Sequence, residues 1–87
     1  MASHLFGSIP NVNQAYYTDG NHEWFGDGPR GATTAQAKWR IYKIEYATPG
    51  NFDSSWMIKW PNGSDAPLFI WDKVNDGTYT YTLLKER

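Results

Sequence analysis

The chain of 87 residues carries eight Lys and Arg against nine Asp and Glu, which gives a formal net charge of −1, and it has no Cys. This length limits it to one domain, in which only about 60% of the surface of the unfolded chain leaves water on folding. The charge balance argues against a nucleic-acid binder held by phosphate contacts, and the lack of Cys excludes disulfide scaffolds and thiolate metal sites. Stability must therefore come from packing or from assembly with other chains.

Aromatic residues make up 17% of the chain and include five Trp, a composition that favours sheets over helices. No apolar stretch approaches the roughly 18 to 20 residues that a membrane-spanning helix needs. The first residues, Met1 to His4, lack the basic and apolar regions of a signal peptide. We expect a soluble protein made in a cytoplasm, with no membrane partner.

Residues 1–36 are predicted to form an irregular N-terminal arm. Gly, Asn, Pro, Ser and Thr interrupt its apolar residues, so that neither a helical nor a strand period persists. The arm is too rich in apolar residues for an ordinary disordered tail, and it needs a surface to lie against: its own sheet, a second copy or another protein. The residues expected to make partner contacts are Leu5, Phe6, Ile9, Val12, Tyr16, Tyr17, Trp24 and Phe25.

Residues 37–87 are predicted to form an antiparallel β domain. Turn signals stand at Pro49-Gly50-Asn51 and at Asn62-Gly63, the strongest hairpin signal in the chain. Between the turns, short runs of β-forming residues predict four strands that are antiparallel neighbours in chain order. These strands are Lys38–Thr48, Ser54–Trp60, Pro67–Asp72 and Thr78–Leu84.

Alternation along the strands predicts which side chains share a face. In the first strand Tyr42, Ile44 and Tyr46 face one side, with Arg40, while Trp39, Ile41 and Lys43 face the other. The fold class is mainly β: a small four-stranded meander, rolled into a mini-barrel or sandwich or covered by the arm, because a single layer must cover its apolar face. The expected core is Trp56, Ile58, Trp60, Phe69, Trp71, Tyr79, Tyr81 and Leu83.

Asp19, His22, Glu23 and Asp27 are the one cluster of acidic and imidazole groups. Oxygen-rich loops can bind Ca²⁺, but the spacing here does not match the ligand positions of an EF-hand loop. A solvated turn whose Asp and Asn side chains bond the backbone is the better interpretation. No Gly-x-Ser-x-Gly elbow, phosphate loop or placed carboxylate pair is present, so we expect neither an enzyme nor a bound cofactor or metal.

Aromatic residues on a sheet also suggest two kinds of binding surface. RNA-binding sheets stack bases on exposed rings beside basic residues, as Lys38, Arg40, Tyr42 and Lys43 could, but the basic residues are few and Glu45 interrupts them. Trp and Tyr platforms also stack on sugar rings, so a carbohydrate-binding β module is the alternative function. Packing in the core of a small sheet accounts for most of these rings.

Four short motifs follow one another at near-fixed spacing over residues 38–81: Trp39-Arg40-Ile41-Tyr42-Lys43-Ile44, Ile58-Lys59-Trp60-Pro61-Asn62-Gly63, Phe69-Ile70-Trp71-Asp72-Lys73-Val74 and Thr78-Tyr79-Thr80-Tyr81. This order resembles a class of short structural proteins of tailed bacteriophages, with a W-x-I, W-A-D-G, W-D-N-R and L-T-Y pattern. Pro61-Asn62 stands where the pattern has A-D, and Lys73 stands where it has N.

The resemblance implies a non-enzymatic component of the phage particle, assembled in the host cytoplasm. A tail, fibre-attachment or head-to-tail location is favoured over capsid decoration. The implied partners are other virion proteins and further copies of the chain, since symmetric homo-oligomers are the commonest assemblies of such subunits.

Overall fold

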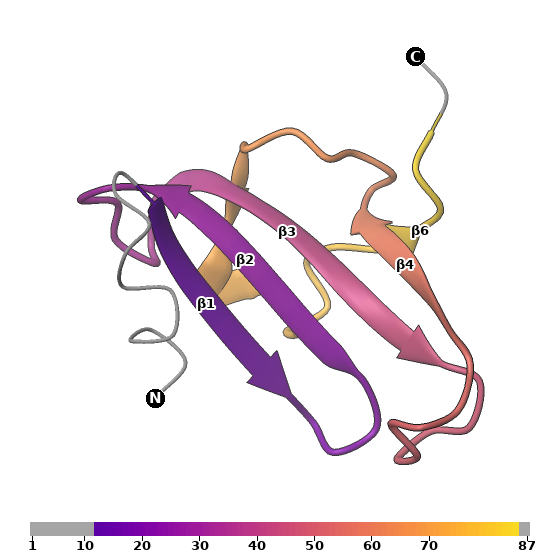
Figure 1. Ribbon diagram of the computed structural model, residues 1–87. Helices are drawn as coiled ribbons and strands as arrows, with labels where there is room; N and C mark the ends of the chain where they lie inside the picture. The colour runs from indigo at the N-terminus through magenta and orange to yellow at the C-terminus, as the bar shows by residue number, and fades with distance from the viewer. Residues whose placement is uncertain (1–11, 86–87) are drawn as a thin grey trace.

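The computed structural model describes residues 12–85, which form one open antiparallel sheet (Figure 1). Its strands are β1 (Val12–Thr18), β2 (Glu23–Pro29), β3 (Ala37–Tyr46), β4 (Trp56–Pro61), β5 (Phe69–Ile70) and β6 (Tyr81–Thr82). A single 3-10 turn, η1 (Trp71–Lys73), follows β5, and no helix within residues 12–85 is long and apolar enough to cross a membrane. The mainly β, antiparallel fold class predicted from the sequence is confirmed.

The strands lie in the order β1-β2-β3-β4-β6, and β5 pairs separately with β3. The ten-residue β3 is the central strand, because its middle and second half pair with β2, its second half with β4, and its first residues with β5. The chain after β5 runs behind β2 and β3 in Figure 1 and forms a second layer on that side. The described residues therefore cover one face of the sheet and leave the other face open.

The prediction of an irregular arm is wrong for residues 12–29, which form the β1–β2 hairpin. The two strands pair without interruption from Val12 opposite Pro29 to Thr18 opposite Glu23. The sequence of β2 does not show alternating apolar and polar residues, because the residues that follow Trp24 on the covered face are Gly26 and Gly28. Glycine has no side chain to mark a buried position. Residues 1–11 lie outside the described part of the chain.

Close packing on the covered face explains why β2 has glycine at two positions. A Cβ atom at Gly26 would lie 2.6 Å from the ring of Trp71, and one at Gly28 would lie 2.9 Å from the ring of Trp39. The two indoles thus lie directly on the β2 backbone, a close approach that only glycine permits. Around them the core consists of Trp24, Trp39, Ile41 and Val74, with Ala15, Phe69, Trp71, Tyr79 and Tyr81 packed against it.

Polar atoms of the second layer find partners close to the core. The Trp39 indole N–H donates to the carbonyl of Thr33 at 2.9 Å, and the Tyr81 hydroxyl donates to the carbonyl of Val74 at 2.7 Å. The Tyr79 hydroxyl accepts from the Ile70 N–H at 2.8 Å. The first bond holds the β2–β3 loop against Trp39, and the other two tie the chain after η1 to β5 and β6; each satisfies a polar group that packing removes from water.

The predicted order of neighbouring strands is wrong after β4. The Asn62-Gly63 turn forms, with φ of 51° and 75° at its two central residues, as a hairpin turn of this kind requires. The chain does not then return along β4: β5 pairs with β3, and β6 pairs with β4. Packing of Trp71 on Gly26, and of Phe69 against the core, favours the longer path, because tertiary packing overrides a local turn preference.

The predicted core is correct for the second layer and wrong for β4. Trp56, Ile58 and Trp60 do share a face, but the register sets Trp56 opposite Tyr46 and Ile58 opposite Ile44, on the side of the sheet away from the core. Trp56 is 58% exposed and Ile58 36%, and Leu83 beyond β6 is also exposed. The apolar side chains of β4 therefore lie on the face of the sheet that the second layer does not cover.

Candidate interaction surface

A row of four aromatic rings crosses the open face, one ring from each of the first four strands. The ring centroids of Tyr16 and Phe25 are 5.2 Å apart, those of Phe25 and Tyr42 5.3 Å, and those of Tyr42 and Trp60 5.5 Å. Directly opposed side chains on adjacent strands lie within reach of one another, so the register alone builds this row. It is an unbroken aromatic band across β1 to β4.

A second apolar group continues the face toward the β3–β4 loop. Ile44 lies opposite Ile58, and Tyr46 lies opposite Trp56. Phe52 from the loop stacks on Tyr46 with a centroid distance of 4.7 Å and an interplanar angle of 14°. We use "open face" for this side of the sheet, with the residues Tyr16, Phe25, Tyr42, Ile44, Tyr46, Trp56, Ile58 and Trp60. Ile44 and Tyr46 are buried among their neighbours on this side, whereas Trp56, Tyr16 and Ile58 are its most exposed members.

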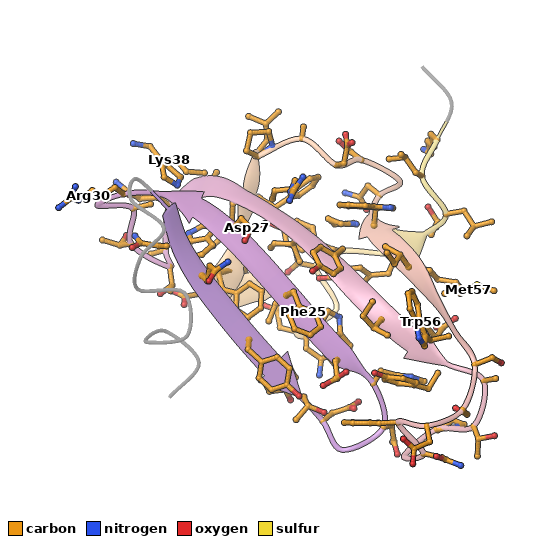
Figure 2. The ribbon with its side chains drawn as sticks, in the orientation of Figure 1. Phe25, Asp27, Arg30, Lys38, Trp56 and Met57 are labelled. Atoms are coloured by element: carbon orange, nitrogen blue, oxygen red, sulfur yellow. The ribbon has the colours of Figure 1, made fainter. Side chains whose placement is uncertain are left out.

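No described strand or helix packs over the open face, which is turned toward the viewer in Figures 1 and 2. Phe25 and Asp27 stand on this side of β2, and Trp56 stands near the start of β4 (Figure 2). Monomeric proteins rarely expose apolar patches of more than a few hundred Å² without a binding role. The open face has the composition of a contact surface.

Polar groups bracket the aromatic row. The Glu23 carboxylate accepts hydrogen bonds from the hydroxyls of Tyr16 at 2.6 Å and Tyr46 at 2.5 Å. The hydrogen bond to Glu23 raises the pKa of Tyr46 to about 12, because ionising the phenol would remove the donor and set two negative charges together. Partial burial, aided by the same carboxylate, raises the pKa of Tyr16.

An ion pair lies on the other side of the row, next to Phe25 along β2 and Tyr42 along β3. Arg40 Nη2 lies 2.8 Å from Asp27 Oδ2, with both side chains partly exposed. Burial raises the pKa of the Tyr42 phenol, which also feels the Asp27 charge. The register sets Glu23 opposite Ile44 and Asp27 opposite Arg40, so charged groups flank the aromatic row on both sides along the strands.

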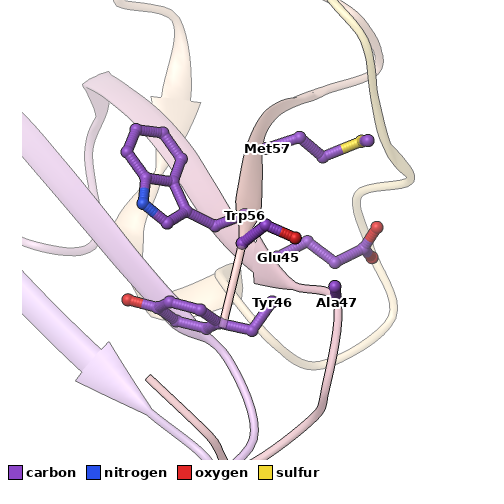
Figure 3. Close-up of a pocket in the computed structure, with 6 residues that line it drawn as sticks. Glu45, Tyr46, Ala47, Trp56 and Met57 are labelled. Atoms are coloured by element: carbon purple, nitrogen blue, oxygen red, sulfur yellow. The ribbon is translucent and has the colours of Figure 1, made fainter. Parts of the chain in front are cut away.

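A shallow hollow of about 120 Å³ lies where β3 ends and β4 begins (Figure 3). Trp56 and Tyr46 stand on one side of the backbone there, and Met57 and Glu45 stand on the other. Pockets for small ligands usually measure about 300 to 1,000 Å³ and enclose most of the ligand. This hollow fits an inserted side chain of another protein better than a cofactor.

The predicted partner-contact residues separate into five groups. Tyr16 and Phe25 lie on the open face, and Tyr17 lies on the other side of β1 with its ring 5.4 Å from that of Trp24. Trp24 is 3% exposed and belongs to the core, so its expected contact with a partner is corrected. Val12 begins β1, where its backbone pairs with Pro29. Leu5, Phe6 and Ile9 lie outside the described residues.

The acidic and imidazole cluster is dispersed among separate partners. Asp19 Oδ1 accepts from the backbone N–H groups of Asn21 and His22, which is the predicted turn geometry, and these bonds, against the opposing effect of burial, lower the pKa of Asp19. His22 Nδ1 accepts from the Tyr46 N–H. Over residues 12–85, no three His, Asp or Glu side chains gather as a metal site would require.

Comparison of the chain with known protein families, with curated proteins and with solved structures finds no match. The open-face residues that the sequence analysis assigned to the core are Trp56, Ile58 and Trp60, and it considered Tyr42 only for an RNA-binding sheet. One signal for them was present: β3 is apolar on both of its faces, a pattern typical of a strand covered on both sides. The chain covers only one of these sides with its described residues.

Proposed function

We propose that this chain is a non-enzymatic structural subunit of a tailed bacteriophage particle, assembled in the host cytoplasm. It associates with copies of itself and with other virion proteins, in the tail, fibre-attachment or head-to-tail region rather than on the capsid surface. The open face makes the contact with those other virion proteins. The phage assignment is supported by the order of motifs in residues 38–81, and the contact surface is supported by the structure of the open face.

The observation that carries the contact role is the exposure of Trp56, at 58%, beside Ile58 and the aromatic row. Large aromatic side chains dominate the energetics of protein interfaces, where they fill pockets near the centre of the contact. In a particle, each subunit repeats the same contact many times, so a modest affinity at each site is sufficient.

Purified particles of the phage that encodes the chain provide the test. Antibodies raised against the chain and labelled with gold should bind the particle at its tail or connector in electron micrographs. A chain that stays entirely in the soluble fraction of the lysate, with none in purified particles, would contradict the proposal.

A matched pair of variants tests the surface itself. Trp56→Ser should lower incorporation into particles at least tenfold, because it removes the most exposed ring of the open face. Leu68→Ser removes a side chain that is still more exposed, at 68%, but lies in the loop before β5 and is not one of the residues of the open face. It should leave incorporation unchanged; equal losses for the two variants would show that the open face is not the contact.

A carbohydrate-binding module is the second candidate, favoured by the exposed Trp56 indole with the polar side chains of Glu23 and Arg40 on the same face. Sugar rings stack on an open ring face, however, and the rings of Phe25 and Tyr42 are stacked on each other with an interplanar angle of 20°. Titration of the tryptophan fluorescence with oligosaccharides separates the candidates. A saturable change that Trp56→Ser abolishes would favour the glycan module.

A further inference from the structure

The strand β1 is the outermost strand on one side of the sheet. It pairs with β2 along all seven of its residues, without a bulge. No described segment pairs with its outer side, and none of the backbone hydrogen bonds in the described loops reaches it. One row of backbone N–H and C=O groups therefore faces away from the sheet along the length of β1.

This edge lacks the features that usually prevent strand pairing. Edge strands are protected by charged side chains, by Pro, by bulges or by very short length. The β1 sequence VNQAYYT has no charge and no Pro. On the other side of the sheet, β4 leaves only residues 56–59 without a second neighbour, includes the charged Lys59, and meets β6 at Trp60 and Pro61.

We propose that β1 pairs antiparallel with β1 of a second copy across a two-fold axis, with Ala15 opposite Ala15 of that copy. This inference rests on the self-association included in the proposed function, and it adds the surface and the register. A two-fold contact places each residue near its own counterpart, so a charged edge would repel itself, whereas β1 is neutral. Ala15 is the central residue of the strand, and only a register centred there pairs all seven residues.

The register also determines how the two open faces meet. With Ala15 at the axis, Gln14 lies opposite Tyr16 of the second copy, so the two Tyr16 side chains become diagonal neighbours at about 7 to 8 Å. Both open faces then lie on the same side of one continuous sheet. The aromatic row of each copy continues into the other, which doubles the contact surface offered to a larger partner.

Cysteine cross-linking tests this register, because the chain has no Cys of its own. In the proposed dimer, Ala15→Cys sets two thiols directly opposite each other, at a spacing that a disulfide accepts, since bonded cysteines have Cα atoms about 4.4 to 6.8 Å apart. The control is Gln14→Cys. Its side chain is more exposed, but in this register its counterpart is a diagonal neighbour, too distant for a disulfide.

We expect light scattering to give a dimer or an even-numbered oligomer for the unmodified chain. Mild oxidation should convert most of Ala15→Cys, and less than a tenth of Gln14→Cys, into a covalent dimer. If circular dichroism shows Ala15→Cys to be unfolded, the double variant Gln14→Cys/Tyr16→Cys tests the same register, because the thiol at position 14 of each copy would then lie opposite the thiol at position 16 of the other.

Each other outcome overturns the inference in a distinguishable way. Equal cross-linking of the two single variants would indicate random collision rather than strand pairing. An oligomer that none of these cysteines cross-links would remove the β1 contact but leave the proposed function intact, with β4 as the next edge to examine. A chain that stays monomeric up to millimolar concentration would overturn both the β1 contact and the proposed self-association.

Discussion

The two faces of the sheet use the same kind of side chain for different purposes. On the covered face, Trp39 is 2% exposed, lies on a glycine and donates its N–H to a carbonyl. On the open face, Trp56 is 58% exposed and lies opposite Tyr46, and no described residue forms a second layer above it. Both faces are aromatic, so composition cannot tell them apart. The difference comes from the β2 glycines, which admit a second layer on one side only.

Replacement of the two tryptophans should give the largest contrast in stability. Trp39→Ala should lower the free energy of unfolding by about 3 to 5 kcal/mol, because it leaves a cavity over Gly28 and removes a buried ring. Trp56→Ala should cost less than about 1 kcal/mol, as exposed substitutions do. Urea denaturation followed by circular dichroism measures both. Similar losses for the two variants would mean that the open face is covered in solution.

Adding a single methyl group to β2 should lower the free energy of unfolding by a smaller amount, through one identified contact. Gly26→Ala should cost about 1 to 3 kcal/mol, since the new Cβ would lie 2.6 Å from the Trp71 ring and the second layer would have to shift. Gly20→Ala is the matched control, because Gly20 has φ of +90° and no atom within 4 Å of the new Cβ, so its cost is backbone strain alone. The change in near-ultraviolet circular dichroism should accompany Gly26→Ala only.

These glycines also show what the sequence could and could not predict. The faces of β3, the shared face of Trp56, Ile58 and Trp60, and the Asn62-Gly63 turn follow from local alternation and turn chemistry, and the structure contains all of them. The β1–β2 hairpin does not follow, because Gly26 and Gly28 gain their meaning only when Trp71 and Trp39 arrive from distant parts of the chain.

The open face was predicted only in part, since Tyr16 and Phe25 were expected to make partner contacts whereas Trp60 was expected in the core. Its members Tyr16, Phe25, Tyr42 and Trp60 come from four strands, and only the register brings them into one row. Sequence alternation can say that Trp56 and Ile58 share a side of β4, but not whether that side meets a second layer. That choice was made by residues 69–82, which pack on the opposite face.

The smallest expected effect concerns the hydrogen bonds of the open face, and it emerges at high pH. The folded chain holds the Tyr46 proton with a pKa of about 12 against an ordinary value of 10.0. This bond therefore contributes fully to stability below pH 10, and its contribution is lost as the pH rises toward 12.

The urea midpoint of the unmodified chain should fall more between pH 9 and pH 11.5 than that of Tyr46→Phe. Glu23→Gln, which keeps an acceptor but removes the charge, should behave like Tyr46→Phe over this interval. Burial raises the pKa of Tyr81 on the covered face, and neither substitution changes that residue. If the urea midpoints of all three proteins fall equally, the alkaline loss of stability comes from the covered face, and the Glu23 hydrogen bonds do not contribute to it.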